Sequence, residues 1–390
     1  MASVAGLLAS ALPLALVVCA WSYATQIRKS GLEVPALAEP TYDLRVEALH
    51  EASIVLARDP RAEVSNERLV KDGVWGLKWR GGYGQIREIE RLDDKLVARR
   101  FVLLDGSRPA AGDFATVDSS AFPSDPALVL GKPHIDITYS SPIGPLAAWF
   151  IPGARETWVI LVHGQGASAQ ETLRILRSAS QGQFPALAVT YRNDIGAPRD
   201  ADGLYRFGQA EWKDLESAVR YALDHGAAGV VLVGYSMGGA IVLSFLYRSE
   251  LADSVVGIVL DAPALDLGTM VDWAARKKRL PLLRLGPPTL LLSLVKLLAT
   301  WRFGVDWKAL DYLSRTDRLQ VPILLFQGAE DNRVPPAMSD ALAHARPDLV
   351  TYLRVRDAGH VESWNLASDR YDELVRSFLQ RCGAGAPGWR

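Results

Sequence analysis

The sequence predicts an α/β fold with a mostly parallel sheet that is covered by helices on both faces. From residue 134 onward, segments with the pattern of strands alternate with segments of helical periodicity. Several of the strands, such as 158–163, are continuous apolar runs, which is typical of parallel strands buried on both faces. One of them, 229–235, runs through a glycine-flanked serine, Ser236, directly into a helix.

Length and composition leave room for one large domain with an additional segment. The chain has 390 residues, of which 49% are hydrophobic and 22% charged, as in an ordinary globular protein. The net charge of -1 gives no reason to expect a nucleic-acid partner. Cys19 and Cys382 cannot form a disulfide framework or a Cys/His zinc site. We expect no metal and no organic cofactor.

The N-terminal 27 residues contain no charged side chain. The run from Val4 to Ala24 has about the length that crosses a bilayer as a helix, so we expect a single-pass membrane anchor over residues 1–27. Small residues near position 19 leave a cleaved signal peptide as the alternative. Arg28 and Lys29 follow, and the positive-inside rule then favours a cytoplasmic location for the rest of the chain.

Residues 28–133 read as a linker and a β-rich accessory segment. Apolar spacing predicts a helix over 42–64. Short runs separated by glycine turns predict antiparallel strands over 74–104. Trp75, Trp79 and Tyr83 recur at strand spacing. Such aromatic residues could line a binding surface, but they are more often core residues, and we expect the core here.

Residues 134–390 form the predicted main domain. We expect strands at 134–141, 146–151, 158–163, 186–191, 229–235, 255–260, 321–326 and 351–355, and helices at 170–180, 209–222, 240–247 and 363–381.

An insertion at about 265–318 interrupts the alternation of strands and helices. Its apolar stretch, 288–299, is too short to span a membrane. Its basic run, 276–279, reads as a solvated helix face rather than a lipid contact. We interpret the insertion as a helical cap over the carboxyl ends of the strands, where ligands bind in open α/β sheets.

Ser236 lies in the pattern G-x-S-x-G, between Gly234 and Gly238. In a nucleophile elbow, the serine occupies a strained turn between a strand and a helix, and the residues two positions away must be small. The N–H groups at the start of that helix favour a developing anion. The alternative is a glycine-rich turn with an incidental serine.

A serine nucleophile needs a base, and the base needs an orienting carboxylate. Asp331 follows the strand at 321–326, and His360 follows the strand at 351–355. The carboxyl ends of parallel strands meet at one edge of a sheet, so both side chains can reach Ser236. Two other carboxylates compete for the acid role, Glu330 and Asp261, and the loop position favours Asp331.

An oxyanion also needs donors. Candidates are the backbone N–H of Met237, directly after the serine, and that of Gln165 in the loop after strand 158–163. Gly164 and Gly166 allow this loop to approach a substrate closely. His163 ends the buried strand, and we expect it to anchor the loop.

Together His163-Gly164, Gly234 to Gly238, Asp331 and Gly359-His360 resemble the α/β-hydrolase superfamily of serine hydrolases, over residues 134–382. The segments 191–194, 208–212 and 328–335 are similar to bacterial membrane-anchored members grouped with prolyl oligopeptidase-like and serine aminopeptidase-like proteins. The resemblance implies that Ser236 attacks a carbonyl, His360 takes its proton and Asp331 holds the imidazole. It also implies that the N–H groups of Gln165 and Met237 stabilise the tetrahedral intermediate and that water then cleaves the acyl-enzyme.

The leading hypothesis is a membrane-tethered serine hydrolase that cleaves carboxylic esters, with a small-molecule or lipid-like acyl substrate. A serine peptidase of the prolyl oligopeptidase or aminopeptidase type is the alternative, because the same triad cleaves amides. A non-catalytic binding module on the same fold is the third hypothesis. The complete set of serine, histidine and aspartate argues against the third.

Overall fold

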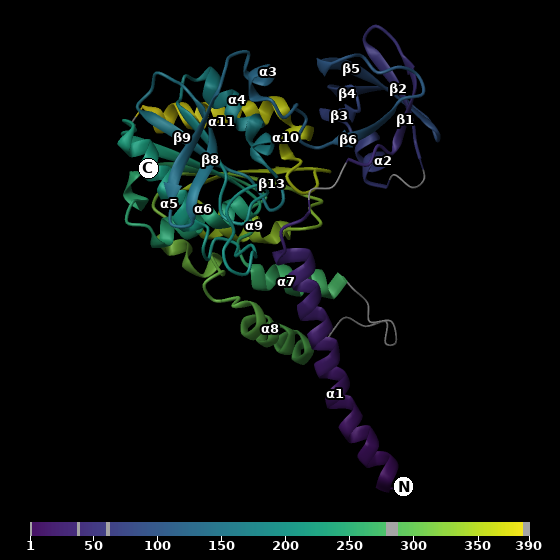
Figure 1. Cartoon of the computed structure of the whole chain (residues 1–390), viewed down its shortest axis with the longest axis vertical. Coiled ribbons are helices and arrows are strands. Elements are labelled where there is room, and N and C mark those ends of the chain that lie inside the picture. Colours follow the sequence, from purple (N-terminus) through teal and green to yellow (C-terminus); the bar gives the residue numbers. More distant parts are fainter. Residues whose placement is uncertain (1, 37–39, 60–62, 278–287, 385–390) are drawn as a thin grey trace.

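The computed structural model describes residues 2–36, 40–59, 63–277 and 288–384. Three parts are distinguished in Figure 1: a small β-barrel, a large α/β domain, and a group of helices that includes the N-terminal helix.

The α/β domain is built on an eight-stranded sheet with the order β14-β13-β12-β11-β9-β10-β8-β7. The strands from β14 to β10 run parallel, whereas β8 is antiparallel to β10 and β7 is antiparallel to β8. The strands are β7 Ile135–Ser141, β8 Gly144–Ile151, β9 Thr157–Val162, β10 Ala186–Val189, β11 Gly229–Tyr235, β12 Val255–Asp261, β13 Ile323–Gly328 and β14 Val350–Val355.

Alternating side chains of the central strands enter two separate hydrophobic cores. In β9, Ile160 and Val162 pack with α5, α6 and α9 on one face, and Val159 and Leu161 pack with α4 and α11 on the other. Burial on both faces explains why this strand is a continuous apolar run. The helices are α4 Leu173–Gln181, α5 Trp212–Asp224, α6 Met237–Arg248, α9 Pro336–Ala345 and α11 Ser368–Gly383.

The accessory segment contains a closed six-stranded barrel with the order β1-β2-β5-β4-β3-β6. Trp75, Trp79 and Tyr83 are buried, and both tryptophans belong to the barrel core. The elements are β1 Leu44–Leu49, β2 Ser53–Ala57, α2 Glu63–Leu69, β3 Trp75–Trp79, β4 Gly82–Leu92, β5 Leu96–Gly106 and β6 Phe114–Asp118, and α3 Pro126–Leu130 follows in the connection to the sheet.

The helix expected over 42–64 is wrong, because that range contains the two strands β1 and β2, at 44–49 and 53–57. Each strand has two fully buried residues with one less buried residue between them: Leu44 and Val46 in β1, and Ile54 and Leu56 in β2. This period of two is the strand pattern. When the apolar residues of the two strands are read as one series, the turn between the strands makes their spacing resemble that of a helix.

The N-terminal helix α1, Ala2–Ile27, continues into a π-helical turn, Arg28–Leu32. It lies against α8, Thr289–Phe303, which belongs to the insertion between β12 and β13 together with α7, Leu267–Lys277 (Figure 1). No helix in the described part of the chain is long and apolar enough to cross a membrane, so the spanning anchor expected over 1–27 is not confirmed. Of the basic run 276–279, the last two residues lie outside the described residues.

Candidate active site

Ser236 occupies a strained position between β11 and α6. Its φ of 49° and ψ of -113° lie in a region that non-glycine residues rarely adopt. A Cβ on Gly234 would lie 2.6 Å from the carbonyl oxygen of Gly238, and one on Gly238 would lie 2.2 Å from that of Val162. Only glycine fits at both positions, which is the geometry of a nucleophile elbow.

A chain of two hydrogen bonds joins Ser236, His360 and Asp331. His360 Nε2 lies 2.9 Å from Ser236 Oγ, and His360 Nδ1 lies 2.7 Å from Asp331 Oδ2. The structure therefore brings these three residues together from the ends of β11, β13 and β14. Each ring nitrogen has one partner, so the imidazole can accept a proton from the serine while the carboxylate holds the other nitrogen.

Backbone and side-chain donors surround the Asp331 carboxylate. Oδ1 accepts from the N–H groups of Arg333 and Val334, both at 2.8 Å, and Oδ2 accepts from Gln327 Nε2 at 3.0 Å. Burial raises the pKa of Asp331, but the hydrogen bond and charge of His360 and these N–H groups together hold it below its usual value. The carboxylate is therefore ionised at neutral pH.

Neither competing carboxylate contacts His360. Asp261 Oδ2 accepts from the hydroxyl of Tyr371 at 3.1 Å, and burial raises the pKa of Asp261 to about 7. The side chain of Glu330 is exposed. The geometry thus favours Asp331 as the residue that orients the imidazole.

Glu362 and Arg174 support the loop that carries His360, and the sequence reasoning missed both. Glu362 Oε2 accepts from the N–H of Gly359 at 3.0 Å, and Arg174 Nη1 donates to the carbonyl oxygen of Val361 at 2.6 Å. Val361 has a φ of 57°, which is unusual for a β-branched residue. Arg174 comes from α4, far from the loop in the sequence, so no local pattern could have identified it.

The loop 163–168 lies against the serine. A Cβ on Gly164 would be 3.2 Å from Ser236 Cβ, and the N–H of Gly164 is held by Glu171 Oε2 at 2.7 Å. Gln165 follows Gly164, and its side chain donates to the carbonyl oxygen of Gly31 at 3.0 Å. Met237 is the first residue of α6, so its N–H has no acceptor within the helix.

His163 is fully buried and lies apart from the hydrogen-bonded chain of Ser236, His360 and Asp331. Its Nε2 is 2.7 Å from Asp194 Oδ2, and its Nδ1 is 2.9 Å from the carbonyl oxygen of Gly164. Burial lowers the pKa of His163, but Asp194 and the Gly164 carbonyl raise it above its ordinary value overall. These contacts suit a residue that fixes the loop.

A cavity of 820 Å³ lies next to this loop. The end of α1 and residues 29–36 form one wall, and α7 and α8 form another with the apolar side chains of Met270, Val271, Leu292 and Val295. The cavity is also lined by Gln165, Gly166, Asn332 and Arg333. It therefore reaches the loop of Gln165 and the loop that carries Asp331.

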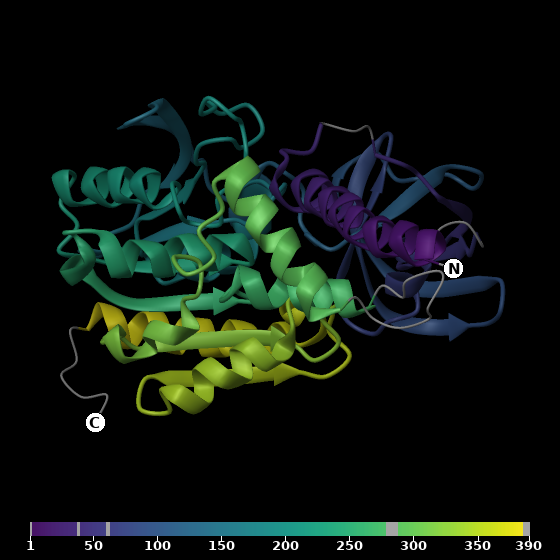
Figure 2. The same ribbon diagram turned by 90° about the horizontal axis from the view of Figure 1, so that it is seen from below.

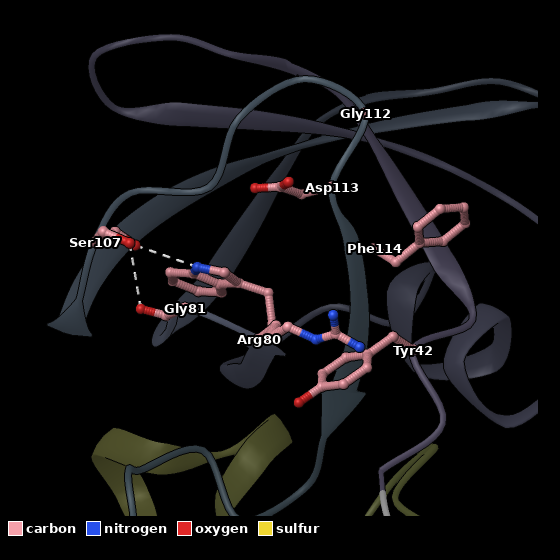
Figure 3. Close-up of a pocket in the computed structure, with 8 residues that line it drawn as sticks. Tyr42, Arg80, Gly81, Ser107, Gly112, Asp113 and Phe114 are labelled. Atoms are coloured by element: carbon pink, nitrogen blue, oxygen red, sulfur yellow. Dashed lines mark hydrogen bonds between the residues drawn. The ribbon is translucent and has the colours of Figure 1, made fainter.

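A second cavity, of 510 Å³, lies on the barrel. Ser236, Asp331 and His360 line neither cavity, but Gln165 and the neighbours of Asp331 line the first. Figure 3 shows Arg80, Asp113 and Phe114 around the second cavity, with the Arg80 side chain next to Tyr42, and Trp79 also lines this cavity. Within the described residues, no group of three or more His, Cys, Asp or Glu side chains could hold a metal ion.

Comparisons with known proteins agree with the fold. A family model described as "Alpha/beta hydrolase family" matches residues 159–377. The structure is similar to the Pyrococcus furiosus esterase Pf2001, with 20% identity and a TM-score of 0.51 over 65% of this chain and 95% of that one. It is also similar to serine hydrolase CCSP0084 from Cycloclasticus zankles, with 17% identity and a TM-score of 0.47 over 64% of this chain and 99% of that one.

One curated relative is dipeptidyl aminopeptidase BIII from Pseudoxanthomonas mexicana. It is 27% identical over 219 residues, which cover 52% of this chain and 29% of the relative. The match therefore spans less than a third of that protein.

Proposed function

Because the chain belongs to the alpha/beta hydrolase family, we propose that it is a serine hydrolase that cleaves carboxylic esters through an acyl-enzyme. The observation that carries this proposal is the unbroken chain of hydrogen bonds from Ser236 through His360 to Asp331. Such a chain supplies the nucleophile, its base and the carboxylate that orients the base.

In the proposed mechanism, Ser236 Oγ attacks the ester carbonyl as His360 Nε2 takes the hydroxyl proton. Asp331 stabilises the imidazolium that forms, since its carboxylate is already ionised. The N–H groups of Met237 and Gln165 donate to the oxyanion. His360 then gives its proton to the leaving alkoxide, and a water molecule activated by the same imidazole cleaves the acyl-enzyme.

The cavity beside the Gln165 loop supports a lipophilic acyl group as the substrate. Its cap wall consists of apolar side chains from α7 and α8, and its volume of 820 Å³ is in the range of small-molecule sites. An acyl chain lying there would gain roughly 0.8 kcal/mol for each methylene that it buries. Activity should therefore rise with acyl length until the cavity is filled.

A peptidase is the second candidate. The matched region of the dipeptidyl aminopeptidase supports it, and the cavity contains charged groups that could contact a peptide terminus, Glu33 and Arg333 among them. Glu33 already pairs with Arg28, with 3.0 Å between Oε1 and Nε. A free amino terminus would have to compete with that pair.

A matched substrate panel separates the two candidates. The full-length protein is assayed on nitrophenyl esters of increasing acyl length and on dipeptide and aminoacyl nitroanilides. The proposal expects hydrolysis of the esters with a chain-length optimum. Turnover of the anilides at rates above those of the esters would favour the peptidase. If neither substrate class is hydrolysed and a serine-directed phosphonate does not label the protein, the non-catalytic binding module is favoured.

A further inference from the structure

The outward surfaces of α1 and α8 are apolar. On α1, Leu14, Val17, Val18 and Trp21 recur at helical spacing, and on α8 the exposed residues are Leu290, Leu297 and Trp301. All seven side chains are between 45% and 74% exposed. They account for seven of the twelve strongly exposed large hydrophobic side chains in the described part of the protein. We call these seven residues the apolar face.

The two helices present the apolar face as one surface. Their backbones lie side by side, and the rings of Trp21 and Trp301 approach each other with 6.5 Å between centroids. Figures 1 and 2 both place α1 and α8 next to each other, and Figure 1 shows both of them away from α4 and α11. Contiguous exposed apolar patches on soluble surfaces usually mark a place where another phase or molecule binds.

The edge of the apolar face is aromatic and basic. Arg302 stacks its guanidinium 3.8 Å above the ring of Trp21 and donates to Thr25 Oγ1 at 2.9 Å. Arg28 and Lys29 follow α1 directly, and Arg28 is in the ion pair with Glu33. Neither helix contains an acidic residue, and Lys296, the other cation of α8, is paired with Asp272 at 2.8 Å.

This combination matches the chemistry of a membrane surface. Tryptophan side chains concentrate at the level of the lipid headgroups, and arginine and lysine near that level are attracted to anionic lipids. Helices that present such a face to a bilayer can lie in the plane of the interface, with the apolar side chains in the acyl boundary. Two copies joined through this face would instead bring two basic edges together without an acidic residue on either helix.

The inner sides of the same helices line the cavity beside the Gln165 loop. Tyr23 and Ile27 of α1 and Leu292 and Val295 of α8 contribute to its walls. A bilayer in contact with the outer side of α1 and α8 would thus lie one helix layer from the cavity.

We propose that the apolar face docks on the surface of an anionic phospholipid bilayer, with α1 and α8 lying along the interface. This docking does not depend on the proposed hydrolysis, because it uses neither Ser236 nor His360. Leu297 on α8 contributes to it together with Val18 on α1.

Vesicle flotation of the full-length protein tests the proposal. The vesicles contain phosphatidylcholine with phosphatidylglycerol, and vesicles of phosphatidylcholine alone form the second arm. We expect stronger partition to the anionic vesicles, weakened by salt, and a loss of about tenfold for each of Leu297→Glu and Val18→Glu, because each removes apolar area from the interface and adds a negative charge. Phe114→Glu, an equally exposed apolar position on the barrel, is the matched control and should float like the wild type.

Tryptophan fluorescence gives a second measurement. Vesicles should shift the emission of the wild type to shorter wavelength, and Trp301→Phe should reduce that shift. The proposal is overturned if the protein remains in the lipid-free fraction, or if Leu297→Glu partitions as the wild type does. It is also overturned if Leu297→Glu leaves flotation unchanged and only converts a dimer into a monomer in sedimentation.

Discussion

Arg68 and Glu362 form an ion pair across the boundary between the barrel and the α/β domain. Arg68 Nε lies 3.0 Å from Glu362 Oε1, and the other carboxylate oxygen of Glu362 accepts from the N–H of Gly359, the residue before His360. Arg68 belongs to α2 of the barrel. Because one carboxylate joins both contacts, the position of the barrel is coupled to the loop that carries His360.

Arg68→Gln tests this coupling. We expect kcat for ester hydrolysis to fall about fivefold with little change in KM, since a partly exposed ion pair contributes roughly 1 kcal/mol. Arg68→Lys should restore most of the activity. The control is Arg91→Gln, which removes an exposed ion pair with Asp93 on the same barrel and should change neither constant. Equal kcat for Arg68→Gln and the wild type would contradict the coupling.

Asp331→Asn and Asp261→Asn distinguish the two buried aspartates near the site. Only Asp331 is hydrogen-bonded to His360, so Asp331→Asn should lower kcat by ~10³–10⁴ while the protein stays folded. Asp261→Asn should leave kcat within about threefold of the wild type, as its partner is Tyr371. Steady-state kinetics with circular dichroism measures both effects, and the opposite ranking would refute the assignment.

Asp261 also predicts a pH dependence of stability. Burial raises its folded pKa from 3.8 to about 7, so the folded state binds a proton that the unfolded state has lost between these values. The free energy of unfolding contributed by this group therefore falls as pH rises from about 4 to about 7. The asparagine side chain cannot ionise, so Asp261→Asn should not lose this part of the free energy of unfolding as pH rises. The melting temperature of Asp261→Asn should therefore exceed that of the wild type at alkaline pH. Near pH 4 the difference should shrink, and thermal unfolding with no such trend would refute the prediction.

Val271→Trp tests the cavity as the acyl site. Val271 lies on α7 and lines the cavity, so a larger side chain there should move the optimal nitrophenyl ester to a shorter acyl chain. Activity on the acetyl ester should change little. Leu290→Trp, at an exposed position on α8, is the control and should keep the wild-type optimum. An unchanged optimum in Val271→Trp would place the acyl chain elsewhere.

Local sequence patterns located the candidate nucleophile and base because each follows a recognisable strand: β11 before Ser236 is fully buried, and β14 before His360 is the partly buried edge strand. Ser236 and His360 lie after β11 and β14, and parallel strands bring their carboxyl ends to one edge of the sheet. The resemblance to a known family added the order of the three residues. Burial on both faces also made the central strands recognisable as apolar runs.

Features that depend on distant contacts could not be found in this way. The wall formed by residues 29–36 is held by contacts such as Gln165 Nε2 to the carbonyl oxygen of Gly31, which join segments far apart in the chain. Glu362 is likewise defined by its partner Arg68 in the barrel. The error over 42–64 arose because two short strands joined by a turn can imitate helical spacing.

The central claim is that Ser236 is the nucleophile, and the most direct measurement compares the full-length wild type with Ser236→Ala. Both proteins are assayed on nitrophenyl esters and treated with a fluorophosphonate, and the labelled peptide is identified by mass spectrometry. The account predicts labelling at Ser236 and a loss of ester turnover by ~10⁴–10⁶ in Ser236→Ala. Equal turnover by the two proteins, or labelling of a different serine, would contradict it.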